Sequence, residues 1–270
     1  MVKPGSIIGG FIIALSIATQ VITLVELANY YWLLFIWVAG LIAGVTYYLG
    51  GVSFETDKME YFTISGIGLG AIGAITAYFS FFQGKTIYED HVLAIHPTAP
   101  WWLTLIAIGL SAVAAFLVAI APLFIAAGAG KQLKGVKPGA IIGGILISGS
   151  LTLQIITIIH FAKYYYLLFF WFIGLIGAIA LAAGARAKWS YSSSEFLVTA
   201  GVFIGILLVL VIWWTVSPQM KANIYAKTLD VSNPLGNLRD VLPTVISFIS
   251  GLVAFFGVLF CSASSKSRAY

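Results

Sequence analysis

The chain consists mostly of long apolar stretches separated by short polar interruptions. The first stretch, residues 5–50, is broken only by the polar segment 26–31. A helix needs about 20 apolar residues to cross the ~30 Å hydrocarbon core of a bilayer. Because this stretch is more than twice that length, it predicts two membrane-spanning helices, at about 5–27 and 31–50, joined by a tight turn.

The same length rule predicts six further helices along the chain. Two polar segments, 84–100 and 217–241, are long enough to form extramembrane loops. The predicted fold class is therefore all-α, a polytopic membrane protein with eight transmembrane helices. The six further helices are expected at about 61–83, 101–127, 139–161, 164–184, 196–216 and 242–262.

An internal repeat organises the chain. Residues 2–51 align with residues 136–185 at a constant offset of 134 and without a gap, and 24 of the 50 positions are identical. The pattern predicts two tandem four-helix repeats, 1–135 and 136–270. Four helices are an even number, so the second repeat enters the membrane from the same side as the first, and the repeats are parallel.

Composition strengthens this interpretation and adds an orientation. The chain is 61% hydrophobic and 9% charged, whereas soluble domains are about 25% charged. Nine of its 14 Lys and Arg residues fall on the side of the termini and five on the other. The bias predicts cytoplasmic termini in a multi-pass protein of the cell membrane. The basic residues sit singly in short loops, so the lipid bilayer is the expected partner and nucleic acid is not.

Small and polar residues form one stripe along the predicted helix 5–27, spaced 4-4-3-4-3, and the same residues recur along the predicted helix 139–161. Such spacing puts them on one helix face, where small residues let backbones approach and polar ones hydrogen-bond across the gap. The predicted helices 61–83 and 196–216 carry a similar Gly-x-x-x-Gly pattern. The positions expected to pack helices are Gly5, Gly9, Gly66, Gly70, Gly139, Gly143, Gly201 and Gly205, with Ile13, Ser16, Ile147 and Ser150 on the same stripes.

The polar part of the stripe has a second interpretation, as a site for a small solute between the repeats. Gln20 and Gln154 lie near mid-bilayer, where an unpaired amide costs several kcal/mol and must find a partner. Glu26 and His160 occupy equivalent positions near the outer helix ends and could form a charge pair. The candidate residues are Gln20, Thr23, Glu26, Gln154, Thr157 and His160.

Two other features of the sequence have a possible chemical or conformational role. The predicted loop 84–100 contains residue types that bind metals, namely Glu89, Asp90, His91 and His96. The two histidines are five residues apart and have no counterpart in the second repeat. They are weak metal candidates, and neither a metal nor a cofactor is expected. Pro122 should kink the predicted helix 101–127, with neighbouring helices satisfying the carbonyl that it frees.

No phosphate-binding loop, dinucleotide fingerprint or zinc-protease motif occurs, and six of the eight helices have no charged residue or histidine in their central portions. An enzyme is therefore less expected than a non-catalytic membrane subunit or scaffold that packs with other membrane proteins in a larger complex. A small-solute transporter or channel, with its site on the axis between the repeats, is the first alternative. Two adjacent four-helix bundles also look like the quinol-handling membrane anchors of some respiratory reductases, an analogy of architecture that makes a quinone-interacting anchor the second alternative.

Overall fold

The computed structural model describes residues 4–52, 59–129, 137–186 and 236–265, together with a few single residues between 204 and 217. All regular structure within these residues is helical, which confirms the all-α expectation for this part of the chain. Most of the predicted helix at 196–216 and most of the predicted loop 217–241 lie outside the described residues. Six described stretches are long and apolar enough to cross a membrane: Pro4–Ala28, Tyr31–Gly51, Glu60–Ile95, Trp102–Gly128, Pro138–Ala162 and Leu242–Cys261.

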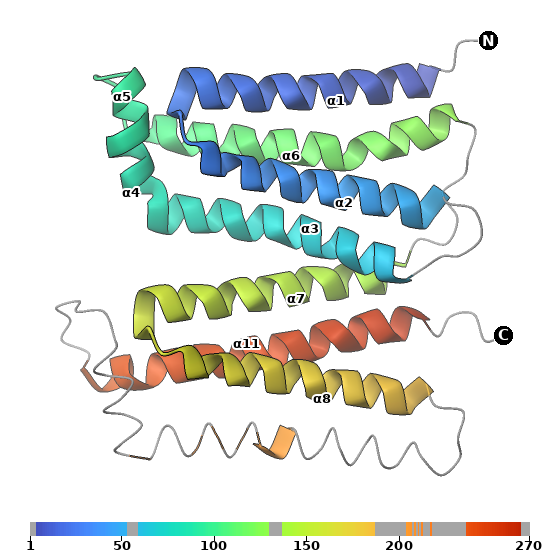
Figure 1. The fold of residues 1–270 in the computed structure, drawn as a ribbon, viewed down its shortest axis with the longest axis vertical. Helices are drawn as coiled ribbons and strands as arrows, with labels where there is room; N and C mark the ends of the chain where they lie inside the picture. Colours follow the sequence, from blue (N-terminus) through green and yellow to red (C-terminus); the bar gives the residue numbers. More distant parts are fainter. Residues whose placement is uncertain are drawn as a thin grey trace. The chain divides into compact units, whose positions relative to one another are not determined.

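The chain divides into two compact units, Met1–Ile145 and Leu146–Tyr270. The first holds α1 to α6 and the start of α7, and the second holds the rest of α7 with α8 and α11 (Figure 1).

The first helical hairpin begins with α1 (Pro4–Ile22), which continues into a π-helical turn, Thr23–Ala28. The helix ends at Asn29, whose left-handed backbone (φ 41°) is a conformation that asparagine tolerates better than most residues. A 3₁₀ turn, Tyr31–Leu33, then leads into α2 (Leu34–Val52). The tight turn therefore lies at the polar interruption that predicted it.

The second hairpin repeats this plan. α7 (Pro138–Ile156) continues into a π-helical turn, Thr157–Ala162, and Lys163 takes the left-handed conformation (φ 47°). A 3₁₀ turn, Tyr165–Leu167, starts α8 (Leu168–Arg186). Every one of these boundaries lies 134 residues after its counterpart in the first hairpin, including the change from α- to π-helix.

The predicted loop 84–100 is helical over most of its length, contrary to expectation. α3 (Met59–Tyr78) passes through a π-helical turn, Phe79–Gln83, into α4 (Gly84–Ile87), and a second π-helical turn, Tyr88–Val92, leads to α5 (Leu93–Ile95). Residues 84–95, here called the cap, run across one end of α1 and α6 (Figure 1).

Burial explains why the cap is helical. Ile87 and Val92 are fully buried in one apolar cluster with Leu24, Ala28 and Leu33 from the hairpin turn. An irregular loop in this place would leave backbone polar groups without partners, whereas a helix satisfies them internally. The polar residues that predicted a loop lie mainly on the outward face of the cap. There Lys85 and Glu89 form a largely exposed ion pair at 3.8 Å.

α6 (Trp102–Gly128) packs against both α1 and α2. Gly40 of α2 lies against the backbone of Ala115, and a Cβ atom added to Gly44 would lie 2.6 Å from the carbonyl oxygen of Val118. Pro122 has no N–H and so frees this carbonyl from its place in the helix. The close approach of the Gly44 backbone allows a Cα–H···O contact to the freed oxygen.

In the second unit, α11 (Gly236–Ser265) packs against α8. Gly174 of α8 lies against the backbone of Gly251. Gly174 is the repeat counterpart of Gly40. Equivalent glycines of α2 and α8 thus touch α6 in the first unit and α11 in the second. In lipid there is no hydrophobic force between helices, and such small-residue contacts supply the van der Waals packing instead.

Candidate functional site

The polar stripe of α1 faces the interior of the first unit. Ser16, Gln20 and Thr23 are all buried, with 2% exposure or less. The Ser16 hydroxyl donates to the carbonyl of Ala114 on α6 at 2.6 Å, and the indole N–H of Trp37 on α2 donates to the Ser16 oxygen at 2.9 Å. One serine thus joins three helices through two hydrogen bonds.

The second unit contains the equivalent arrangement. The indole N–H of Trp171 on α8 donates to Ser150 Oγ at 2.9 Å, the same length as its counterpart. The hydroxyl of Ser250 on α11 donates to the carbonyl of Ser150 at 2.5 Å, and the Ser150 hydroxyl donates within its own helix, to Ile147 at 2.8 Å. The direction of the bond to the last helix is reversed, but the same three helices are joined.

The equivalent residues Gln20 and Gln154 differ in their hydrogen bonds between the units. Gln154 is fully buried and donates from Nε2 to Ser247 Oγ of α11 at 3.1 Å, while its Oε1 has no partner. Gln20 is 2% exposed, and neither Nε2 nor Oε1 has a hydrogen-bond partner. The hydroxyls of Ser111 and Thr104 on α6 are likewise buried without partners.

The remaining candidates for a site between the repeats lie at or near the π-helical turns. The hydroxyls of Thr23 and Thr157 donate back to the carbonyls of Thr19 and Leu153, both at 2.8 Å, so each is satisfied within its own helix. Glu26 is exposed and His160 half-buried. The hydrogen bonds of Thr23 and Thr157 lie within single helices and do not test a site on the axis between the repeats. That site stays a prediction.

His91 of the cap and His96, which directly follows the cap, contact the first hairpin turn. His96 Nε2 lies 2.7 Å from the backbone oxygen of Glu26, one of the carbonyls left open at the end of the first helix. The ring of His91 lies 4.8 Å from that of Tyr30. Within the described part of the chain, no three metal-ligand side chains come together. Sequence reasoning did not identify these contacts, because nothing in the spacing indicates that the cap folds back on the turn.

Tyr30 and Tyr164 are equivalent residues in the two hairpin turns, just outside the candidate membrane spans. Burial raises the pKa of Tyr30 above its ordinary value of 10.0, and the neighbouring Tyr78 adds to the effect. Burial raises the pKa of Tyr164 in the same direction, with a contribution from Tyr166. Both phenols therefore keep their protons to higher pH than a tyrosine in water.

The glycines predicted to pack helices lie in several environments. A Cβ added to Gly5 would lie 2.7 Å from the carbonyl oxygen of Phe124, and one added to Gly9 would lie 3.2 Å from that of Ala121, so both touch α6. Gly205 has no atom within 4 Å of an added Cβ among the described residues. Gly66 and Gly143 are buried and Gly70 and Gly139 half-buried, whereas Gly201 lies outside the described residues.

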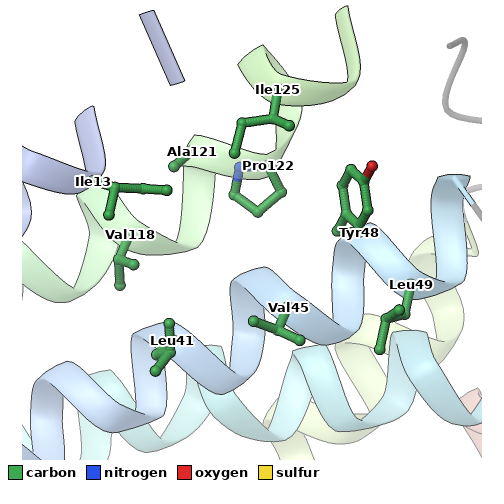
Figure 2. A pocket seen from close by; sticks show the side chains of 9 residues that line it. All are labelled: Ile13, Leu41, Val45, Tyr48, Leu49, Val118, Ala121, Pro122 and Ile125. Atoms are coloured by element: carbon green, nitrogen blue, oxygen red, sulfur yellow. The ribbon is translucent and has the colours of Figure 1, made fainter. Parts of the chain in front are cut away.

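An apolar trough lies along α6 between α1 and α2, with a cavity volume of about 350 Å³. Figure 2 shows Ile13 of α1 on one side, four residues of α2 on the other, and Pro122 and its neighbours of α6 between them. Tyr48 supplies the one side-chain oxygen in the lining. The lining residues are Ile13, Leu41, Val45, Tyr48, Leu49, Val118, Ala121, Pro122 and Ile125.

The comparisons give no family for this chain: no family model, curated protein or solved structure matches it.

Proposed function

We propose that this protein is a non-catalytic integral membrane subunit or scaffold that packs with other membrane proteins in a larger complex. The observation that carries the proposal is how the polar stripe is used. Ser16 and Ser150 each join three helices of their own unit, through Trp37 and Ala114 in the first and through Trp171 and Ser250 in the second. In both units, the polar side chains thus hold the helices together.

The apolar outer surfaces of these helices also support a membrane subunit or scaffold. Large apolar side chains such as Phe11, Val25 and Phe116 are about half exposed or more. In a membrane such side chains meet lipid or other membrane proteins. A protein whose polar groups are turned inward and whose outer faces are apolar is suited to lateral association.

The proposed architecture has eight transmembrane helices in two parallel four-helix repeats, 1–135 and 136–270. The 134-residue offset of every boundary in the two hairpins supports it, as do the equivalent Trp–Ser bonds and the equivalent glycines Gly40 and Gly174. The proposed location is the cell membrane with both termini in the cytoplasm, on the basis of the Lys and Arg distribution.

Purification in a mild detergent tests the function. The subunit proposal predicts that other membrane proteins co-purify at a fixed stoichiometry, and that the purified chain alone moves no solute in liposomes. A chain that purifies alone, and that exchanges or conducts a solute when reconstituted, would instead support the transporter with a site at Gln20 and Gln154 on the repeat axis.

The trough beside Pro122 favours a second candidate, the quinone-interacting membrane anchor. An isoprenoid tail is apolar and suits a lining of aliphatic side chains, and the Tyr48 hydroxyl can donate a hydrogen bond to a quinone carbonyl. Organic extraction of the purified protein tests this candidate. Recovery of one equivalent of quinone per chain, and of several-fold less quinone from Val45→Trp, would support this candidate. An extract without quinone would exclude it.

A further inference from the structure

Gln20 and Ser111 are two neutral polar side chains that remain unpaired inside the first unit. Gln20 is 2% exposed and Ser111 is fully buried, and no polar atom of either side chain has a hydrogen-bond partner. In the interior of a membrane protein, each such group costs several kcal/mol when unsatisfied. Groups of this kind almost always have a partner in folded proteins, either protein or ordered water.

The register between α1 and α6 places these two side chains at the same level. Ser16 of α1 is bonded to Ala114 of α6, and the two helices are antiparallel, since Gly9 lies against Ala121. Moving four residues along α1 from Ser16 reaches Gln20. Moving three residues back along α6 from Ala114 reaches Ser111, about one helical turn in the same direction.

The second unit shows the same geometry with the bond closed. Four residues along α7 from Ser150 is Gln154, and three residues back along α11 from its partner Ser250 is Ser247. There the glutamine donates directly to the serine, from Nε2 to Oγ at 3.1 Å. Gln20 and Ser111 therefore occupy the positions that correspond to this hydrogen-bonded pair, but the polar side-chain atoms of both have no hydrogen-bond partner.

We propose that a single buried water molecule lies between α1 and α6 at this level and hydrogen-bonds both Gln20 and Ser111. Water is the occupant that fits the groups present. It can accept from the Gln20 amide and bond the Ser111 hydroxyl at the same time, and buried waters make about three bonds to otherwise unsatisfied groups. The pair carries no charge that would call for an ion. The first unit thus uses water where the second uses a direct bond.

Solid-state NMR of the ¹⁵N-glutamine-labelled protein in lipid bilayers tests the proposal, with magnetisation transferred from water to the side-chain amides. Spectra of Gln20→Met and Gln154→Met assign the two signals. Gln154 serves as the comparison because its Nε2 already bonds Ser247 and only its Oε1 is left without a partner, whereas both polar atoms of Gln20 are. We expect transfer from water to be at least about threefold stronger for Gln20 than for Gln154, and Ser111→Ala to reduce the Gln20 signal while Ser247→Ala does not.

Equal transfer to both amides would overturn the proposal, as would a direct contact between the Gln20 amide and the Ser111 hydroxyl without transfer from water. A Gln20 signal that is unchanged in Ser111→Ala would overturn the bridge between the two side chains. Once the two signals are assigned, the wild-type comparison decides the first point without Ser111→Ala or Ser247→Ala. Its result is also independent of whether partner proteins co-purify.

Discussion

At the residue scale, the most informative positions are those at which the two hairpins carry the same side chain in the same contact. Trp37 and Trp171 each donate to the serine of their own unit at 2.9 Å. The sequence places both tryptophans at equivalent positions of the internal repeat, 134 residues apart. It could not supply the bonds, because the partner serine lies on a different helix and the rotation of one helix against another is not encoded in spacing.

These indole bonds can be measured. Trp37→Phe and Trp171→Phe each remove one interhelical hydrogen bond, and we expect each to lower the free energy of unfolding by about 0.6 to 2 kcal/mol, the range for such bonds in membranes. Trp32→Phe, at an exposed position, should change it by much less. Reversible unfolding in lipid-containing micelles measures the difference. Equal effects at Trp32 and Trp37 would contradict the role assigned to the bond.

The turn tyrosines predict a pH dependence. The pKa of Tyr30 and that of Tyr164 are raised above 10.0 in the folded protein. Above pH 10 the unfolded chain therefore loses these protons first, and the folded state binds more protons than the unfolded one. Stability is present in full below about pH 10 and falls as the pH rises through the folded values.

Unfolding measured from pH 8 to pH 12 tests this sign. In the variant Tyr30→Phe with Tyr164→Phe, the loss of stability at high pH should be smaller than in the wild type, and the tyrosinate absorbance of the folded protein should reach half its change at lower pH. A double variant with the wild-type pH profile would show that these phenols are not linked to folding.

At the scale of elements, the two hairpins followed from the sequence and the cap did not. The single polar interruption at residues 26–31 located the first turn, because one apolar run was too long for one crossing. Residues 84–95 were expected to form a loop because the segment is rich in polar residues. Their helix depends on Ile87 and Val92, which are buried against residues about 60 positions earlier, and no local pattern reveals such a distant surface.

The α2–α6 contact predicts the cost of a single methyl group. A Cβ on Gly40 would overlap the backbone of Ala115, which cannot move like a flexible side chain. We expect Gly40→Ala to destabilise the protein by about 1 to 3 kcal/mol, as overpacking usually does. Gly10→Ala is the control, since its Cβ meets no atom within 4 Å among the described residues, and it should be neutral or stabilising by up to about 1 kcal/mol. Equal unfolding free energies for the two variants would contradict the contact.

At the scale of the whole molecule, the internal repeat is the strongest information in the sequence. The 24 identities at one offset predicted that the second hairpin would copy the first, and the described helices do so to the residue, including the left-handed Asn29 and Lys163. The function is harder to predict from the amino-acid sequence than the repeat is. A stripe of serine, glutamine and threonine has the same spacing whether it packs helices or lines a path for a solute.

The parallel arrangement of the two repeats is the central claim, and the sidedness of the two hairpin turns tests it most directly. In a Cys261→Ser background, single cysteines are introduced as Asn29→Cys, Lys163→Cys and Lys134→Cys, and intact cells are labelled with a membrane-impermeant thiol reagent. Parallel repeats with cytoplasmic termini predict that positions 29 and 163 are labelled from outside, and that position 134 is labelled only after the cells are opened. Labelling of 29 and 163 from opposite sides would contradict the account.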